Sequence, residues 1–436
     1  MLRGAGSRYR ELRVRSVLLL ATTTGYQIRS FGDAARVVDA ALVFASDRCD
    51  QLDDPWWDHA IPVRFIDEQR ETEVILTACA GRRPDAVIAV GDRPTVLAAL
   101  VSTALGLPGN PPAAARRSRN KLEARSAFRR AGLLTPEFRA VSLLDDPATL
   151  AAATRYPAVL KPLALSGSRG VMRVNDAQQF VAAFERLRTL MAAPDVRAER
   201  DAVHDLALIE SFIAGSEYAV EGVLTRGVLQ PLAIFDKPDR LDGPFFEETV
   251  YVTPSRQPRD VQDQVLTAVA AAARALELHH GPIHAECRVS QTGVYVLEVA
   301  ARPIGGLCSK ALRFERANAS AIAPTSLEEL LLRHALGEDV SGYRRESRAS
   351  GVMMIPIPQR GILRGVEGIE AARRVANVDE VQVTAKPDSL LVPLPEGRSY
   401  LGFIFAHGDD AAATERSLRN AHSRLRFVIE REIPVT

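Results

Sequence analysis

The sequence predicts a protein of the α/β class with α+β portions, built from more than one domain. Two observations lead to this prediction. Apolar runs typical of buried strands alternate with runs of helical periodicity through the first quarter of the chain, as in a parallel sheet with helices on its faces. The chain also has 436 residues, which is too many for one ordinary hydrophobic core.

The first predicted domain contains the clearest alternation. Its end is marked by residues 107–112, where consecutive prolines and a glycine break both the helical and the strand period. The pattern predicts strands at 14–21, 40–45 and 85–90, and helices at 31–39, 68–81 and 95–105. We place the domains at 1–115, 116–206, 207–325 and 326–436.

The rest of the chain is less regular. A charge-rich helix is expected at 117–131, ended by Gly132 in the position of a C-terminal cap. Residues 236–255 combine charge, glycine and proline with little periodicity, so we expect a long functional loop there. Further strands are expected at 156–161, 171–174, 207–212, 217–224, 351–357 and 399–407, and a further helix at 327–336.

The composition excludes several classes of partner. The 55 basic and 54 acidic residues give a formal net charge of +1, so no overall field would attract nucleic acid or an acidic membrane. The apolar run 17–20 is too short for a signal segment or a membrane span. The four cysteines have no C-x-x-C pair, which disfavours zinc or disulfides and favours the cytoplasm. We therefore expect small-molecule substrates and leave a homodimer open.

Glu286 and Glu298 lie in adjacent β-prone runs, H-A-E-C-R-V and V-Y-V-L-E-V. Gln291, Thr292 and Gly293 supply a hairpin turn that would bring the two carboxylates close together. Two like charges on an apolar sheet are costly unless a cation lies between them, and Mg²⁺ with nucleotide phosphates is the usual solution. The alternative is that each glutamate faces solvent on the polar side of its strand.

Arg302 follows the second of these runs and can place a planar, permanently charged guanidinium beside the same site. Gly305 and Gly306 would let backbone amides approach an anion closely. His284 precedes Glu286 by two residues, so both side chains should share one face of the strand. His284 is a candidate substrate contact or proton acceptor, or else a satisfied core histidine.

Two lysines are candidates for binding phosphate. Lys161 ends an apolar strand just before the loop S-G-S-R-G, whose backbone N–H groups can also meet phosphate oxygens; alternatively, the glycines form only a hairpin turn. Lys121 lies at a helix start, where a cation is unfavourable unless an anion is near. The competing interpretation makes Lys121 one of several solvated charges on this helix, with Arg116, Arg117, Arg125, Arg129 and Arg130.

Glu210 lies in the strand predicted at 207–212, and Glu217 and Glu221 lie in the next predicted strand, 217–224. A carboxylate at the end of a buried strand can accept from an adenine amino group or a ribose hydroxyl, although surface exposure is the default for each. The sequence contains no H-E-x-x-H or G-x-S-x-G pattern; the H-x-x-x-H spacing of His280 and His284 lacks the glutamate of a zincin. A hydrolase of the zincin or catalytic-triad type is therefore unsupported.

In order, these segments resemble the ATP-grasp superfamily of carboxylate–amine ligases, over nearly the whole chain. The motifs are R-S-R-N-K-L-E-A-R, Y-P-A-V-L-K-P with S-G-S-R-G-V, A-L-I-E-S-F-I-A-G-S-E-Y-A-V-E-G, H-A-E-C-R-V and L-E-V-A-A-R-P-I-G-G. Residues 235–255 and 394–408 look most like bacterial L-amino-acid ligases that form dipeptides, of the alanine–anticapsin ligase type. The implied fold has an N-terminal parallel-sheet domain, a central lid subdomain, a catalytic core and a C-terminal α/β subdomain.

The resemblance implies a site for ATP and for one or two Mg²⁺ ions, with Mn²⁺ as a substitute. It places Glu286 and Glu298 on the metal, but Ala300 stands where many members have an asparagine ligand, so a second ion would rely on the glutamates and water. The resemblance further implies Arg302, Gly305 and Gly306 around the reacting groups, Lys121 and Lys161 on the phosphates, Ser166, Gly167, Ser168 and Gly170 in a closing loop, Glu210, Ser211, Phe212 and Ile213 beside adenine, and Glu217 on the ribose.

The implied reaction has two stages. A substrate carboxylate attacks the γ-phosphate of ATP to give an acyl phosphate and ADP, and an amine then displaces phosphate to form an amide. Closure of the glycine loop would keep water from hydrolysing the acyl phosphate. Rival interpretations are a nucleotide-precursor or carboxylase-type ligase that uses glycine, formate or bicarbonate, and a non-catalytic ATP-binding regulatory protein.

Substrate selection is expected in the loop at 235–255. Charged side chains there would bind the ends of an amino acid, and aromatic side chains would shape a pocket, unless they are ordinary loop charges and packing residues. The candidates are Glu247 or Glu248 for an α-ammonium, Lys237 or Arg256 for a carboxylate, and Phe245, Phe246 and Tyr251 for the pocket.

Overall fold

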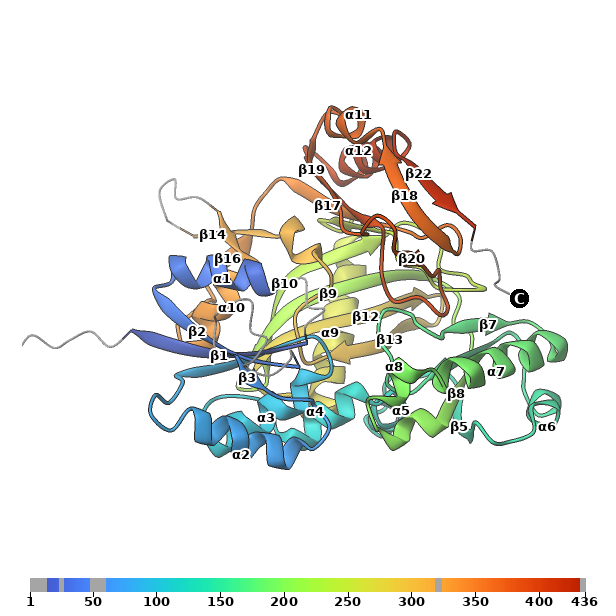
Figure 1. The fold of residues 1–436 in the computed structure, drawn as a ribbon, viewed down its shortest axis with the longest axis horizontal. Helices are drawn as coiled ribbons and strands as arrows, with labels where there is room; N and C mark the ends of the chain where they lie inside the picture. Colours follow the sequence, from blue (N-terminus) through green and yellow to red (C-terminus); the bar gives the residue numbers. More distant parts are fainter. Residues whose placement is uncertain (1–13, 23–26, 48–59, 318–323, 432–436) are drawn as a thin grey trace, which may run out of the picture.

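The computed structural model describes residues 14–22, 27–47, 60–317 and 324–431 (Figure 1). Within them the strands form five sheets, and the α/β class predicted from the sequence is confirmed. Among these residues no helix is both long and apolar enough to cross a bilayer. Cys49 lies outside the described residues, whereas Cys79, Cys287 and Cys308 are free and buried.

The N-terminal sheet is parallel and has the order β3-β2-β1-β4. Helices flank it, so the predicted alternation of strand and helix is confirmed. Buried side chains alternate between its two faces, and both faces are therefore covered. The elements are β1 (Arg15–Ala21), α1 (Ile28–Val37), β2 (Ala40–Ser46), β3 (Ile61–Pro62), α2 (Glu68–Ala78), β4 (Ala86–Val90) and α3 (Pro94–Ala104).

The single helix predicted at 117–131 is wrong. The chain forms α4 (Pro112–Arg119) and α5 (Lys121–Arg130), which are separated at Asn120. Asn120 adopts an extended conformation, and its side chain accepts hydrogen bonds from the backbone N–H groups of Leu122 and Glu123, as an N-cap does. The break makes Lys121 the first residue of a new helix.

A second sheet, with the order β5-β8-β6-β7, forms a separate layer at the lower right of Figure 1. Its own apolar core includes Phe180, Phe184 and Leu187 of α7. We call this part the lid. Its elements are β5 (Phe138–Ser142), α6 (Pro147–Ala152), β6 (Ala158–Pro162), β7 (Met172–Val174), α7 (Ala177–Met191), α8 (Pro194–Arg197), the short 3-10 helix η2 (Ala202–Asp205) and β8 (Leu206–Ser211).

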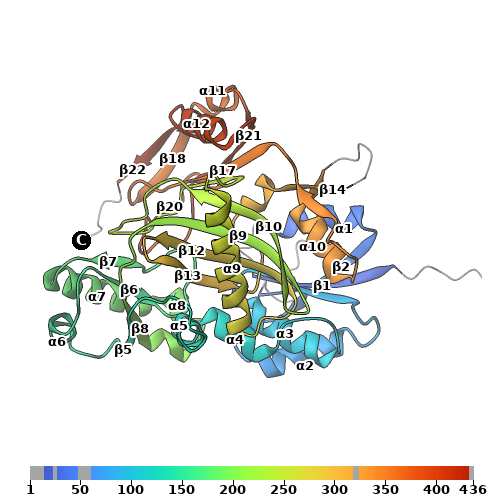
Figure 2. The same ribbon diagram turned by 180° about the vertical axis from the view of Figure 1, so that it is seen from behind.

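The largest sheet has eight strands in the order β13-β12-β9-β10-β11-β17-β21-β19. Figure 2 shows α9 (Arg259–Ala275) running across its back face. The segment expected as a loop at 236–255 forms strands at both ends. Asp236 and Lys237 belong to β10, and Val250 to Thr253 form β11, which pairs with β17. The strands are β9 (Ser216–Thr225), β10 (Val228–Lys237), β11 (Val250–Thr253), β12 (Gly281–Ser290), β13 (Gly293–Ala300), β17 (Ala349–Ile355), β19 (Val378–Val383) and β21 (Gly402–Gly408).

The C-terminal elements extend this sheet and cover it. Strands β17, β19 and β21 belong to the same sheet as β9 and β12, and α12 (Ala411–His422) packs on them. Two small sheets complete the fold. The first contains β14 (Arg313–Arg316), β15 (Thr325–Ser326) and β16 (Tyr343–Arg345), and the second contains β18 (Gly361–Glu367), β20 (Leu390–Leu391) and β22 (Arg426–Glu430). The helices of this part are the 3-10 helix η3 (Cys308–Ala311), α10 (Leu327–Ala335) and α11 (Ile369–Arg373).

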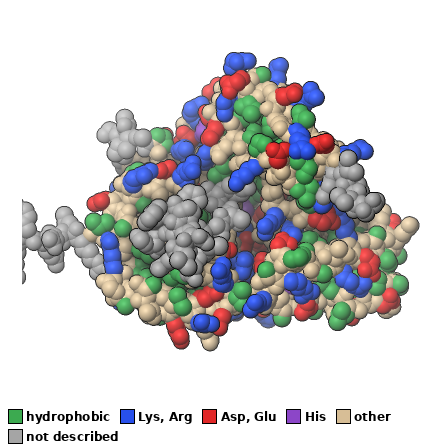
Figure 3. Space-filling model, in the orientation of Figure 1, with side chains coloured by type: hydrophobic (Ala, Val, Ile, Leu, Met, Phe, Trp, Pro, Cys, Tyr) green, Lys and Arg blue, Asp and Glu red, His purple; other side chains and the backbone are tan. Residues whose placement is uncertain are grey.

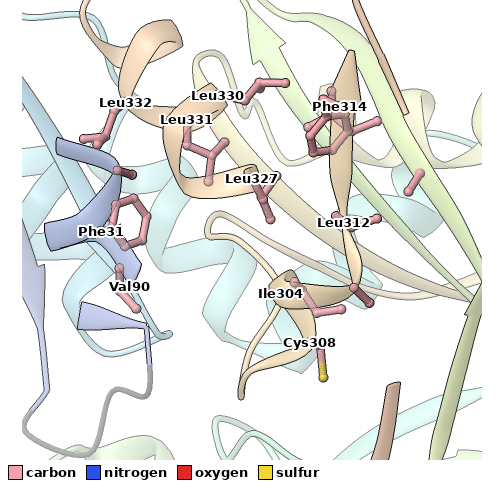
Figure 4. Packing of buried hydrophobic residues seen from close by; sticks show 14 of the residues in the cluster. Phe31, Val90, Ile304, Cys308, Leu312, Phe314, Leu327, Leu330, Leu331 and Leu332 are labelled. Carbon is pink, nitrogen blue, oxygen red and sulfur yellow. The ribbon is translucent and has the colours of Figure 1, made fainter. Parts of the chain in front are cut away.

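One apolar cluster joins the N-terminal sheet to the central sheet (Figure 4). Phe31 of α1 and Val90 of β4 belong to the same buried cluster as Phe314 and Leu331. Burial of a large apolar side chain contributes roughly 1.5–3 kcal/mol, so a cluster of this size fixes the relative position of the two parts. The end of β4 is thereby held beside the central sheet.

Candidate active site

A cavity of about 600 Å³ lies where the N-terminal sheet, the lid, the central sheet and the C-terminal segment meet. Charged side chains from each of the first three parts line it. They include Asp92, Lys121, Lys161, Glu286, Glu298 and Arg302. On the face seen in Figure 3, basic and acidic side chains are interspersed.

The two glutamates predicted as a pair do face each other. Glu286 of β12 is the direct cross-strand partner of Glu298 of β13, and the hairpin predicted between them is confirmed. Side chains directly opposite each other on paired strands lie on the same face, and both of these line the cavity. Each has an ammonium beside it: Lys121 Nζ lies 3.7 Å from Glu298 Oε2, and Lys237 Nζ lies 3.1 Å from Glu286 Oε1.

Lys237 is the centre of a buried charge cluster. Its ammonium lies 2.8 Å from Glu217, 2.6 Å from Glu248 and 3.1 Å from Glu286, and oxygens of these three carboxylates all lie within 4.8 Å of one another. Burial opposes its charge, but the carboxylates outweigh this and raise the pKa of Lys237 well above its usual value. The predicted role of Lys237 in binding a substrate carboxylate is therefore wrong for this conformation, because its donors are taken.

The carboxylates of this cluster differ in proton affinity. Burial and the charge of Glu286 raise the pKa of Glu248 to about 7. Burial also acts on Glu286, but Lys237 and His284 outweigh it and hold the pKa of Glu286 well below its usual range. Glu286 therefore stays ionised at neutral pH, as a metal ligand must, whereas Glu248 is poised to exchange a proton.

Glu217, predicted to bind a ribose, lines the cavity and contacts two protein cations. Its carboxylate lies 2.8 Å from Lys237 Nζ and accepts a hydrogen bond from Arg288 Nε at 2.9 Å. Arg288 is buried and also donates to the backbone oxygen of Ile213 at 2.8 Å. Glu217 therefore holds two cations in place, and its contact with a ribose stays a prediction.

His284 lies between two carboxylates. Its Nδ1 is 3.0 Å from Glu221 and its Nε2 is 3.6 Å from Glu286, and the ring is buried. Burial lowers the pKa of His284, but the hydrogen bonds to Glu221 and Glu286 outweigh it and raise that pKa to about 9. A protonated His284 would donate a proton rather than accept one. Its ring lines the cavity, so its role as a substrate contact stays a prediction.

Lys161 and Glu210 form a buried ion pair at the lid. Lys161 Nζ lies 2.5 Å from Glu210, whose other oxygen lies 2.7 Å from Arg125 Nε. Burial lowers the pKa of Lys161 to about 8, against the opposing effect of Glu210. Arg125 is fully buried and also donates to the backbone oxygen of Leu297 at 2.8 Å. The interpretation of this helix as solvated is wrong for Arg125 and for Lys121.

Arg302 is held by a residue that the sequence analysis missed. Its Nε and Nη2 donate to the two oxygens of Asp92 at 2.9 and 3.1 Å. Asp92 lies just beyond the carboxyl end of β4, where ligand-binding residues of parallel sheets gather, and this position was the available signal. Gly306, also in the cavity wall, has a φ of +61°, which favours glycine, and a Cβ there would lie 3.2 Å from the ring of Phe403, a tight contact.

The glycine loop forms part of the cavity wall. Gly167 and Gly170 have φ values of +63° and +75°, a conformation that glycine adopts without strain. A Cβ at Gly170 would also lie 3.1 Å from Leu187, Leu190 and Pro162. The loop and strand-end residues predicted for ATP that line the cavity are Ser166, Gly167, Ser168, Glu210, Ser211, Phe212 and Ile213, and the backbone of Gly305 joins them.

The predicted substrate residues divide into two groups. Glu248, Tyr251 and Phe246 line the cavity. Arg256 does not, because it pairs with Asp236 at 3.1 Å and with Glu415 at 2.9 Å, so its predicted carboxylate-binding role is wrong. Glu247 and Phe245 also lie outside the lining of this cavity, and Phe245 instead faces Arg186 of the lid.

Comparisons with known proteins agree with this architecture. Residues 154–311 match the ATP-grasp domain, and residues 353–430 match the L-amino acid ligase C-terminal domain 2. The crystal structure of the L-amino acid ligase from Bacillus licheniformis is similar with a TM-score of 0.79 and 25% identity, over 95% of this chain and 99% of that chain.

Two curated relatives are similar over part of the chain. Carnosine synthase 1 of Gallus gallus is 32% identical over 56% of this chain and 27% of its own length. Alanine–anticapsin ligase of Bacillus amyloliquefaciens is 28% identical over 42% of this chain and 41% of its own length. The chain thus spans less than half the length of either relative in these alignments.

Proposed function

Because the chain combines an ATP-grasp domain with the C-terminal domain of the L-amino acid ligases, we propose that it joins the carboxylate of one amino acid to the amine of another at the expense of ATP. One observation carries this proposal. Lys121, Lys161 and Arg302, which lie far apart in the sequence, line the same cavity as the facing pair Glu286 and Glu298. The products are an amide, ADP and phosphate.

ATP would lie between the lid and the central sheet. The cavity wall here offers the backbone of residues 211–213 at the end of β8 for the base and the ammonium groups of Lys121 and Lys161 for phosphates. Lys121 Nζ already donates to the backbone oxygen of Leu165 at 2.8 Å, so it is held at the start of the glycine loop. Glu210 would keep Lys161 in position and remains near enough to accept from an adenine amino group.

The residues present fit Mg²⁺. Glu286 and Glu298 supply carboxylate oxygens, which are the ligands that Mg²⁺ prefers, on one face of a hairpin with no histidine or cysteine ligand required. When bound, the ion would neutralise phosphate charge and align the γ-phosphate for attack. Ala300 offers no ligand atom, so further ligands would be water or phosphate oxygens.

The chain's own residues account for the two stages. The first carboxylate attacks the γ-phosphate beside Arg302, whose guanidinium is buried and whose charge is fixed by Asp92. The amine then attacks the acyl phosphate, and Arg302 with the backbone N–H groups at Gly305 and Gly306 would bind the negative charge that develops on the carbonyl oxygen. The glycine loop and lid exclude water from the intermediate. The buried free thiols of Cys287 and Cys308 are consistent with a reducing cytoplasm as the site of this reaction.

A phosphate-release screen over pairs of amino acids, with ATP and Mg²⁺, tests the proposal. Release should require two amino acids together and should disappear in Glu298→Ala. Release with bicarbonate, or with glycine and a phosphoribosyl amine, would instead establish one of the rival ligases. ATP binding without release for any pair would support a regulatory protein.

A further inference from the structure

Two arginines line the cavity on the side of the N-terminal sheet. Arg93 follows Asp92 directly at the start of α3, and Arg119 is the last residue of α4, two residues before Lys121. Burial opposes the ionisation of Glu199 of the lid, but its hydrogen bond with His204 and the charges of Arg93 and Arg119 outweigh burial and lower the pKa of its carboxyl group. The two side chains therefore converge on one region of the cavity wall.

Both arginines keep donors that the described part of the chain does not use. Arg119 Nε is buried without a hydrogen-bond partner there, and the nearest acid to its Nη1 is Glu68 at 3.9 Å. Arg93 donates from Nη2 to the backbone oxygen of Arg64 at 2.9 Å, but its Nε lies 4.0 Å from Glu199, beyond hydrogen-bond distance. A buried guanidinium donor without an acceptor is costly, so this wall is suited to an acceptor from a ligand.

The acidic side chains near Arg93 and Arg119 do not remove the preference of this wall for a ligand acceptor. Asp92 is already bound by both donors of Arg302. Glu199 lies 3.1 Å from His204 Nε2 and 4.0 Å from Arg93 Nε, so it is hydrogen-bonded to His204 and approaches Arg93 only at ion-pair distance. Two guanidinium groups facing a cavity offer the planar N–H pairs that bind carboxylates in a bidentate manner.

We propose that Arg93 and Arg119 bind the carboxylate of the amine substrate, so that this substrate is itself an amino acid and the product keeps a free carboxylate. The inference rests on the proposed function. The carboxylate to be phosphorylated belongs beside Glu286 and Glu298, on the central sheet. Arg93 directly follows Asp92, the partner of Arg302, so Arg93 lines the cavity from the side of the N-terminal sheet, across from the sheet that carries the two glutamates.

The test compares an amine substrate with its primary amide. Phosphate release is measured for the best amine of the pair screen, for example L-alanine, and for the matching amide, L-alaninamide, in the unaltered chain and in Arg93→Gln and Arg119→Gln. We expect kcat/KM in the unaltered chain to be at least about tenfold higher for the acid than for the amide. Each substitution should lower kcat/KM for the acid by about tenfold, mainly through KM of the amine, and leave the amide nearly unaffected.

Arg116→Gln is the matched control, because Arg116 lies on the same helix, is half exposed and pairs with Glu68 outside the cavity lining. This variant should leave kcat/KM unchanged for both the acid and the amide. Equal use of acid and amide by the unaltered chain, or an equal loss for both in the two variants, would overturn the inference and leave the proposed function standing. If the unaltered chain releases no phosphate with any amine, the proposed function itself has failed and the inference falls with it.

Discussion

Arg302 and Asp92 form a two-point ion pair, with Nε to Oδ1 at 2.9 Å and Nη2 to Oδ2 at 3.1 Å. Burial of Asp92 opposes its ionisation, but Arg302 outweighs this and holds the pKa of Asp92 below its usual value. The pair joins the end of β4 to the loop after β13. The N-terminal sheet therefore positions the guanidinium that we assign to the reacting groups.

Asp92→Asn should reduce turnover more than it reduces ATP binding. The amide keeps the shape of the side chain but offers only one acceptor oxygen and no charge, so Arg302 loses its fixed orientation. We expect kcat to fall by about tenfold to a hundredfold with KM for ATP within about twofold of the unaltered value. Steady-state phosphate release measures both.

Asp33→Asn is the control for that substitution, because Asp33 is an exposed acid that pairs with Arg36 on α1. Its kinetics should match those of the unaltered chain. A normal kcat in Asp92→Asn would mean that Arg302 does not need this partner.

Glu210→Gln should destabilise the fold much more than Lys161→Met. The first change leaves two buried cations, Lys161 and Arg125, without a charged partner, at a cost of about 3–5 kcal/mol. The second leaves Glu210 still paired with Arg125 and should cost only about 1–2 kcal/mol. Urea unfolding without ATP gives both values, with Glu137→Gln as a control at an exposed pair. Equal losses of unfolding free energy in the two variants would contradict the view that Lys161 and Arg125 share the carboxylate of Glu210.

The contribution of His284 to stability should depend on pH. Its pKa in the folded protein is about 9, compared with about 6.5 in an unfolded chain, so its stabilising effect is complete below pH 6.5 and is lost as the pH rises through 9. The difference in unfolding free energy between the unaltered chain and His284→Asn should shrink by about 3 kcal/mol between pH 6 and pH 10. Taking this difference cancels the titration of groups that do not interact with His284. A difference that grows with pH would show that His284 is neutral when folded.

The lid contacts the C-terminal segment, and weakening this contact should reduce the coupling of ATP hydrolysis to amide formation. Arg186 Nη2 donates to Glu396 at 2.8 Å, and Gly170 N donates to the backbone oxygen of Pro395 at 2.8 Å. In Glu396→Ala we expect a severalfold higher KM for ATP and a larger share of ATP hydrolysed without amide formation, because the closed lid is less populated.

That share is measured as phosphate released minus amide formed. Glu370→Ala, at an exposed pair with Arg373 on α11, is the control and should behave like the unaltered chain. Unchanged coupling in Glu396→Ala would mean that the lid closes without this contact.

Local patterns were sufficient for part of this site. Strand alternation and a hairpin turn placed Glu286 opposite Glu298, because side-chain direction follows the two-residue period of a strand. The glycine loop and Lys161 were singled out because the lysine ends a buried strand directly before a run of small residues, although an ordinary hairpin turn fits the same pattern.

Contacts between distant parts of the chain could not be predicted in the same way. Asp92 and Arg302 are separated by 210 positions, and nothing in either segment reports the other. Arg125 looked solvated because its neighbours on the helix are charged, yet its position faces Glu210 across the interior. Lys237 was assigned to a ligand because the three carboxylates around it come from three different segments.

The most direct test of the account follows one oxygen atom. With the carboxylate substrate labelled with oxygen-18, attack on the γ-phosphate and later displacement by the amine must leave one labelled oxygen in the phosphate released. We predict one oxygen-18 atom per phosphate, measured by mass spectrometry, with the label absent from ADP. Unlabelled phosphate formed together with the amide would contradict an acyl phosphate intermediate and, with it, the proposed mechanism.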